Sequence, residues 1–164
     1  MLNYGLLGSG EKLPHFIKCA AALGIETIVA VSSNEQSQAA VNAGASILLV
    51  TGLDVDSADI VNEKLAIVQN ISIPDNHAPL CIGAAVSNSA QNKEEVEEAW
   101  KCRDAGFNFV MVADSLYRGG NDPTEHCGAV IRSMSAKSSV KWASAKSMSG
   151  KGEGAREYLG DIMM

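Results

Sequence analysis

The chain has 164 residues, of which 46% are hydrophobic, 20% are charged and only 5% are aromatic. This length supports one domain whose core is built from aliphatic side chains rather than rings. The formal net charge of −6 offers no basic field, so nucleic acid is not expected as a partner. No apolar run approaches the roughly 20 residues of a membrane helix, and no charged-then-apolar leader opens the chain. We therefore expect a soluble protein that does not span a membrane.

The cysteines and histidines predict neither a metal site nor a disulfide framework. The cysteines lack CxxC spacing, which favours free thiols in a reducing compartment; they are Cys19, Cys81, Cys102 and Cys127. The histidines are isolated from one another, and surface or capping roles suit them best; they are His15, His77 and His126. We expect no metal and no cofactor.

The elements predicted in chain order alternate between helices and short apolar strands. A short strand is expected at Tyr4–Leu7, followed by a helix. Further strands without polar alternation follow at residues 28–31, 47–50, 80–86 and 109–112. Such strands are buried on both faces, which indicates a parallel sheet covered by helices.

Helix boundaries agree with this alternation. Glycines that can adopt the left-handed conformation should end three helices; they are Gly24, Gly44 and Gly106. Capping signals indicate helix starts at Asn92 and at Asp122-Pro123, and further helices are expected from Asn34 to Gly44 and from Asp59 to about Asn70. On the helix that begins at Asn92, we expect Trp100 in the core and a solvated acidic face that includes Glu95 and Glu98.

The composition changes near residue 137, which predicts an α/β domain over 1–136 and a tail over 137–164. Serine, glycine and lysine dominate the tail, and a short amphipathic stretch closes it. Such a segment buries too little of itself to fold alone. We expect it to dock on a partner chain or on the open edge of the sheet, with four anchors: Trp142, Tyr158, Leu159 and Ile162.

Several segments together resemble the indole-3-glycerol phosphate synthase family. The stretch "LGIETIVAV" is similar to the family's fifth strand, and "NAGASILLVTGLD" to its sixth. "SNSA" stands where the family has "SESG" after its seventh strand, and "AGFNFVMVADSL" is similar to the eighth. The resemblance covers roughly residues 5–135. It implies an α/β fold with a partial, half-barrel (TIM-barrel-like) parallel sheet of about four or five strands, flanking helices and an extended C-terminal tail.

The departures from this family fall on its reactive groups. By the resemblance, the general acid/base glutamate falls at Ala30, an asparagine pair at Thr51 and Gly52, and a second glutamate at Asn88. The family's catalytic lysine belongs to a strand before the matched region. Ring closure needs a cation to polarise the carbonyl and carboxylates to move protons. The resemblance therefore implies a pseudoenzyme with no catalytic residues.

The family also holds a substrate phosphate on the loops after its last two strands. The matching positions include Ser87, Asn88 and Ser89 on one loop, and Ala113 and Ser115 on the other. The glycines that allow close backbone approach in the family are replaced at Ala90 and Ala113. We expect at most a vestigial phosphate site here.

The leading hypothesis is a non-catalytic structural or accessory subunit of a larger assembly or homo-oligomer. Relatives of the resembled family in algae and plants serve plastid metabolism, so the plastid stroma is one expected location and the cytoplasm another. A photosynthetic assembly is the concrete version of this hypothesis. One alternative is a phosphate-binding lyase of tryptophan biosynthesis completed by another chain or by dimerisation. Another is a small sensor of phosphate ligands.

Overall fold

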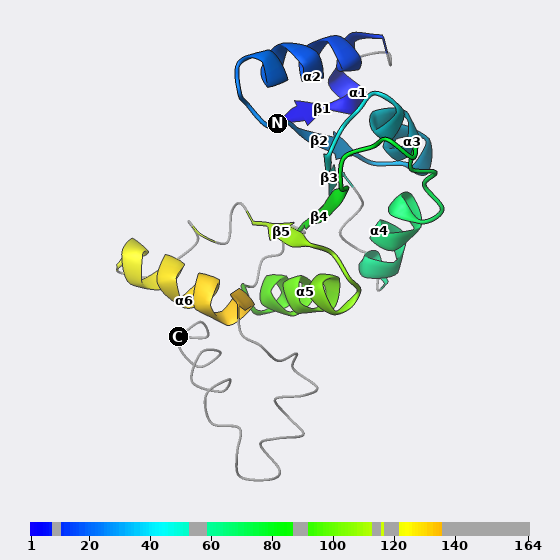
Figure 1. Cartoon of the computed structure of the whole chain (residues 1–164). Helices are drawn as coiled ribbons and strands as arrows, with labels where there is room; N and C mark the ends of the chain where they lie inside the picture. The colour runs from blue at the N-terminus through cyan, green and yellow to red at the C-terminus, as the bar shows by residue number, and fades with distance from the viewer. Residues whose placement is uncertain (8–10, 53–58, 87–91, 113–115, 117–121, 136–164) are drawn as a thin grey trace. The chain divides into compact units, whose positions relative to one another are not determined.

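The computed structural model describes residues 1–7, 11–52, 59–86, 92–112, 116 and 122–135. Five parallel strands form one open sheet in chain order, β1-β2-β3-β4-β5 (Figure 1). They are β1 Leu2–Asn3, β2 Ile28–Val31, β3 Ile47–Val50, β4 Cys81–Ala85 and β5 Phe109–Met111. The sheet is not closed into a barrel. It confirms the predicted α/β class and fits a partial barrel-like fold.

Six helices alternate with the strands over the described residues. They are α1 Tyr4–Leu7, α2 Lys12–Ala22, α3 Asn34–Asn42, α4 Ile60–Val68, α5 Asn92–Asp104 and α6 Pro123–Ser135. The strand expected at Tyr4–Leu7 is wrong, because these residues form α1 and the strand lies just before them. Asn3 explains the turn into α1, since its Oδ1 accepts a hydrogen bond from the Leu6 N–H at 3.4 Å. Periodicity alone cannot separate a short strand from a single helical turn.

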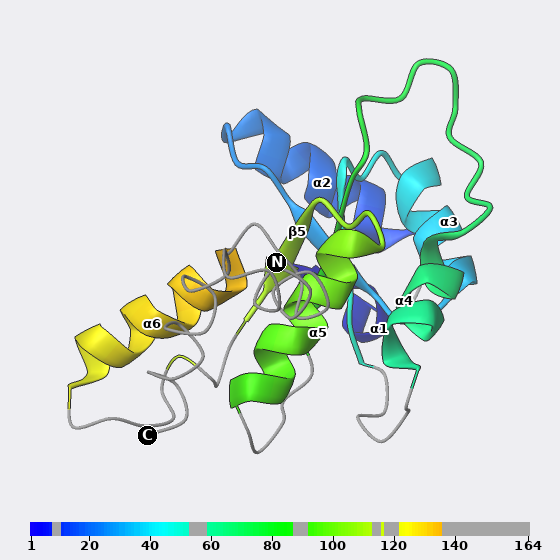
Figure 2. The ribbon, with the colours of Figure 1, turned by 90° about the horizontal axis from the view of Figure 1, so that it is seen from below.

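The chain divides into two compact units, of which the first comprises Met1–Ala85 and Phe107–Phe109. Its strands pair in parallel register, with Ile28 opposite Ile47 and Ile47 opposite Cys81. The central residues of β2 and β3 are almost fully buried, as expected for strands covered on both faces; they are Val29, Ala30, Val31, Leu48, Leu49 and Val50. Helices α3 and α4 contact each other and lie side by side in both views (Figures 1 and 2).

The predicted helix ends are confirmed. Gly24, Gly44 and Gly106 have φ values of +70°, +90° and +100°. Each follows the last turn of a helix and donates its N–H back to it, as Gly44 does to the Val41 carbonyl at 2.9 Å. These left-handed residues turn the chain from a helix into the next strand.

The helix starts are largely as predicted. Asp122 Oδ1 accepts the Thr124 N–H at 2.8 Å and the Glu125 N–H at 3.3 Å, and Pro123 is the first residue of α6. Helix α3 begins at Asn34, but the preceding Ser33 caps it by accepting the Gln36 N–H at 3.3 Å. The pKa of the exposed Glu35 carboxyl is lowered, first by a hydrogen bond with the Ser33 side chain and second by one with the backbone N–H of Glu35 itself.

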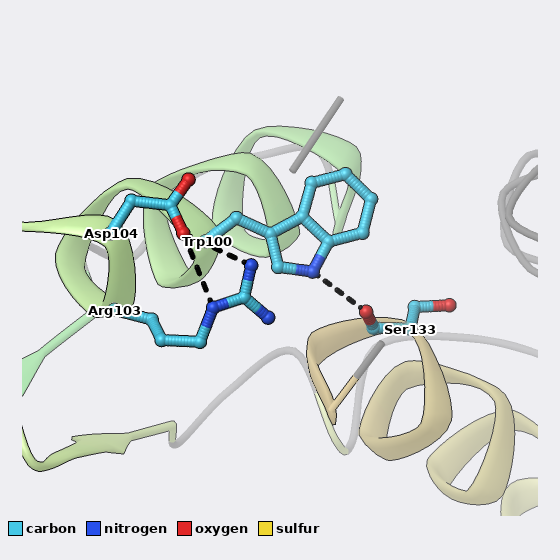
Figure 3. A network of polar contacts seen from close by, with 4 residues as sticks. All are labelled: Trp100, Arg103, Asp104 and Ser133. Carbon is cyan, nitrogen blue, oxygen red and sulfur yellow. Dashed lines mark hydrogen bonds and ion pairs between the residues drawn. The ribbon is translucent and has the colours of Figure 1, made fainter. Parts of the chain in front are cut away.

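The second unit, Val86–Gly106 with Val110–Met164, contains α5 and α6. Trp100 of α5 is 2% exposed, and its Nε1 donates a 2.9 Å hydrogen bond to the Ser133 carbonyl of α6 (Figure 3). The core position expected for Trp100 is confirmed, and its hydrogen-bond partner lies on helix α6. Glu95 and Glu98 are also buried, at 2% and 8% exposed, so the expected solvated acidic face is wrong for them.

Glu95 and Glu98 are buried because the buried face of α5 is unusually wide. Its buried residues are Glu95, Val96, Glu98, Ala99, Trp100 and Cys102. At about 100° per residue they cover roughly 200° of the helix, about twice the usual amphipathic stripe. Lys93 and Glu94 remain exposed. The sequence pattern identified the apolar stripe but could not show how far burial extends beyond it.

Candidate functional site

Parallel α/β proteins bind ligands at the carboxyl ends of their strands, so these ends define the candidate site. The described residues that follow β2, β3, β4 and β5 are small, hydroxylated or aliphatic. They are Ser32 and Ser33 after β2, Thr51 and Gly52 after β3, Val86 after β4 and Val112 after β5. None of these six side chains can serve as a general acid or base near neutral pH.

The polar groups at the ends of β2 and β3 are engaged in local structure. The Ser32 N–H and hydroxyl both donate to Gln36 Oε1, at 2.9 and 3.2 Å, while Ser33 caps α3. The Thr51 N–H donates to the Val31 carbonyl at 3.0 Å and extends the pairing of the two strands. Gly52 has a φ of +77°, a conformation that glycine adopts readily. These residues therefore fix the backbone where β2 and β3 end.

Ala30 occupies the position that corresponds, by the resemblance, to a catalytic glutamate. It is 2% exposed and pairs in register with Asn3 of β1 and Leu49 of β3. A carboxylate here would lie in the buried part of the sheet, where ionisation is costly without a partner. The position is filled by a methyl group packed in the core.

Sequence reasoning missed Lys64 of α4, a charged side chain that reaches the end of β4. Lys64 is 2% exposed, and its Nζ donates a 2.6 Å hydrogen bond to the carbonyl of Ala85, the last residue of β4. Burying an ammonium costs several kcal/mol unless it is hydrogen-bonded and paired. A signal was available: Lys64 lies four residues after Ile60 and three before Ile67, which places it within the apolar stripe of α4.

The ends of β4 and β5 lie together. The Val86 N–H donates to the Met111 carbonyl at 2.9 Å, so the two loops that follow these strands begin side by side. The phosphate-site candidates on those loops lie outside the described residues and stay predictions; they are Ser87, Asn88, Ser89, Ala113 and Ser115.

The partner-binding candidates of the tail also lie outside the described residues; they are Trp142, Tyr158, Leu159 and Ile162. The domain boundary between residues 136 and 137 falls just after the last described residue, Ser135. It stays a prediction as well.

The remaining thiol and ionisable groups of one chain form no complete metal site within the described residues. All four cysteines are thiols, and Cys19 alone is classed as exposed. Within the part of the chain that the structure describes, no group of three or more His, Cys, Asp or Glu side chains could hold a metal ion. No helix there is long and apolar enough to cross a membrane. His77 Nδ1 lies 2.6 Å from the Ala78 carbonyl, and its Nε2 is buried without a hydrogen-bond partner among the described residues.

Comparisons with known proteins add no family assignment. No protein-family model matches the chain, and a search of curated proteins finds no significant match. The fold and strand ends define an α/β protein with an open parallel sheet. The likeness to indole-3-glycerol phosphate synthase therefore remains a hypothesis that rests on the residues quoted above.

Proposed function

We propose that this chain is a non-catalytic α/β protein of indole-3-glycerol phosphate synthase type that acts as a structural or accessory subunit of a larger assembly. The observation that carries the proposal is the lack of an acid or base at three described positions, one inside β2 and two at the end of β3. Ala30 is buried in the sheet, and Thr51 and Gly52 follow the next strand. None of these groups can move a proton near neutral pH.

The buried cation does not restore that chemistry. Lys64 reaches the end of β4, but its side chain is 2% exposed and its ammonium donates to the Ala85 carbonyl. A lysine that polarises a substrate carbonyl must reach the substrate. Lys64 is better suited to fixing α4 against the end of β4.

The open sheet and the tail support the role of a subunit. An open sheet leaves strand edges that a partner can cover, and β1 at one end of the order has only two residues. Several large apolar side chains of the first unit are exposed; they are Met1, Leu6, Phe16, Leu23, Ile25 and Ile73. The tail adds four candidate anchors: Trp142, Tyr158, Leu159 and Ile162. A plastid assembly, photosynthetic complexes included, is the version of this proposal that the resemblance suggests.

Three measurements test the proposal. The purified chain should not convert carboxyphenylamino-deoxyribulose phosphate into indole-3-glycerol phosphate. The native protein should elute at a mass well above that of its 17.2 kDa chain. Deleting residues 138–164 should release it from that complex while circular dichroism still reports an α/β core. Turnover above background that is abolished by a substitution in this chain, with an unchanged circular dichroism spectrum, would contradict the non-catalytic role. A native protein of monomer mass would contradict the subunit role.

A second candidate function is favoured by the Val86–Met111 hydrogen bond. Because the exits of β4 and β5 are adjacent, the loops carrying Ser87 and Ser115 start side by side, and such loops can hold a phosphate group in parallel α/β proteins. This supports a phosphate-binding enzyme completed by another chain, or a phosphate sensor. Ligand-induced thermal stabilisation separates this candidate from the first.

A further inference from the structure

Helix α2 presents a thiol and an imidazole together on its exposed face. Cys19 stands four residues after His15, and this spacing places both side chains on one side of the helix. Cys19 Sγ and His15 Nε2 lie 3.6 Å apart, and both residues are exposed. The opposite face is the covered one, where Leu13 is buried and Ile17 is half-buried. The pair therefore points away from the core of its unit, where a ligand can reach it.

The distance between these two atoms suits a tetrahedral metal ion. Zinc binds thiolate sulfur at about 2.3 Å and imidazole nitrogen at about 2.0–2.1 Å. At a tetrahedral angle of about 109°, these bond lengths place the two ligand atoms about 3.6 Å apart. Sγ of Cys19 and Nε2 of His15 already have this separation. A thiolate with an imidazole also selects zinc over magnesium or calcium, which prefer oxygen ligands.

The orientation of the imidazole is supported by its neighbour. The ring of Phe16 lies edge-on to the ring of His15, with centroids 6.1 Å apart and an interplanar angle of 64°. A ligand that is already oriented loses less conformational freedom when it binds. The two side chains thus form half of a tetrahedral site.

The other half must come from outside the chain. Structural zinc sites almost always have four ligands, and the described residues of one chain hold no group of three or more His, Cys, Asp or Glu that could bind a metal ion. We propose that two copies of this chain share one zinc ion through His15 and Cys19 of each copy. The result is a site with two thiolates and two imidazoles. A two-fold axis through the ion brings the same face of α2 from both copies together.

Apolar side chains beside the pair favour a second copy, rather than water, as the source of the missing ligands. Phe16 lies three residues before Cys19 and Leu23 lies four residues after it, so all three share one face of the helix. Phe16 is 43% exposed and Leu23 is 76% exposed. Pairing two α2 helices across the ion removes this apolar surface from water, which is favourable. Water ligands would leave it exposed.

Metal binding is coupled to the protonation of the ligands. Zinc takes the thiolate and the neutral imidazole, so each Cys19 thiol releases its proton to solvent when the ion binds. The inference rests on the proposed subunit role and deepens it, because it identifies one contact that joins two chains. It uses no residue of the tail.

Cobalt(II) and zinc(II) added to the full-length protein test this site. The protein is first treated with a chelator and kept reduced with a phosphine. Cobalt should produce a thiolate-to-metal charge-transfer band and the intense visible bands of a tetrahedral ion, saturating at one ion per two chains. Zinc should displace cobalt and double the mass of the chelator-treated protein. His15→Gln/Cys19→Ser should lose the band and the change in mass, with an unchanged circular dichroism spectrum.

A matched control is His126→Gln/Cys127→Ser, which makes the same two changes on α6 and should keep the band and the doubled mass. A cobalt spectrum of octahedral type without the charge-transfer band would overturn the proposal, because no thiolate then binds the ion. Saturation at one ion per chain without a change in mass would also overturn it, since solvent would then complete the site. Pairing is measured on the isolated chain, and the subunit role on the native complex and its release by deleting residues 138–164, so the two proposals fail separately.

Discussion

The ring of Phe109 in β5 lies directly against the backbone of Gly83 in β4, leaving no room for a side chain at residue 83. A Cβ atom built on Gly83 would overlap three carbons of the ring. The residues that precede Gly83 and Phe109 are joined by two hydrogen bonds. Asn108 Oδ1 accepts the Ile82 N–H, and the Asn108 backbone N–H donates to the Ile82 carbonyl, both at 2.8 Å. Glycine is thus a packing requirement of this strand pair.

Gly83→Ala should therefore destabilise the protein by about 1–3 kcal/mol, the usual cost of overpacking a core. The free energy of unfolding in urea measures this. Gly128→Ala is the control, because Gly128 lies inside α6 and its neighbour is the mobile end of the Arg132 side chain. That change should stabilise the helix by up to about 1 kcal/mol.

A double-mutant cycle identifies the ring as the cause. In a Phe109→Leu background, Gly83→Ala should cost at least about 0.5 kcal/mol less than in wild type. Strictly additive effects would mean that the clash is not with Phe109.

The second prediction concerns Trp100, whose indole N–H caps a carbonyl in the last turn of α6. The Ser133 carbonyl lies near the end of that helix and accepts the indole N–H at 2.9 Å. Trp100→Phe removes a buried hydrogen bond to this carbonyl, so the free energy of unfolding should fall by about 1–3 kcal/mol. Trp142→Phe, the other tryptophan, should change it by no more than about 0.5 kcal/mol. A neutral Trp100→Phe would mean that the hydrogen bond contributes nothing to stability.

The third prediction concerns Lys64. Lys64→Met keeps the volume and the apolar stem but removes the donor to the Ala85 carbonyl. The expected loss is about 1–3 kcal/mol of unfolding free energy, from the orphaned acceptor. Lys101→Met, an exposed lysine on α5, should change stability by less than about 0.5 kcal/mol. If Lys64→Met stabilises the protein instead, the cost of burying the ammonium exceeds the value of its hydrogen bonds.

The sequence predicted those parts of the fold that depend on local pattern. Strands β2 and β3 have the expected bounds, because each apolar run follows a glycine that ends a helix. Burial of Lys64 and the fit of Gly83 under Phe109 were not predicted. Both depend on which faces meet, and Gly83 and Phe109 are 26 residues apart.

The candidate site was predicted only in part for the same reason. The sequence indicated where β4 and β5 end, and the Val86–Met111 hydrogen bond brings those ends together. Ala30, Thr51 and Gly52 lie at the expected strands. The positions of Ser87 and Ser115 fall outside the described residues. Loop conformation depends on contacts that no local pattern encodes.

The fourth prediction tests the two adjacent loops. If the phosphate site is vestigial, 5 mM phosphate or ribose 5-phosphate should leave the melting temperature nearly unchanged, because stabilisation follows RT ln(1 + [L]/Kd). A Kd of about 50 µM would instead give about 2.7 kcal/mol and a shift of several degrees. Loss of such a shift on Ser115→Asp, which places a negative charge on the loop, would establish phosphate binding and favour the sensor or enzyme.

The last prediction asks whether the chain can still accept the carboxylate that the resembled family uses. Ala30 is 2% exposed in the middle of β2, with buried Val29 and Val31 on either side. Ala30→Glu would place a large ionisable side chain in a packed sheet, and an uncompensated buried charge costs about 3–5 kcal/mol. We expect a loss of that order, or failure to fold, measured by urea unfolding. The control is Ala22→Glu on the exposed end of α2, which should cost no more than about 0.5 kcal/mol. If Ala30→Glu folds with near-wild-type stability, there is space or a partner for the carboxylate at this position, and the argument for a closed, non-catalytic core at β2 fails.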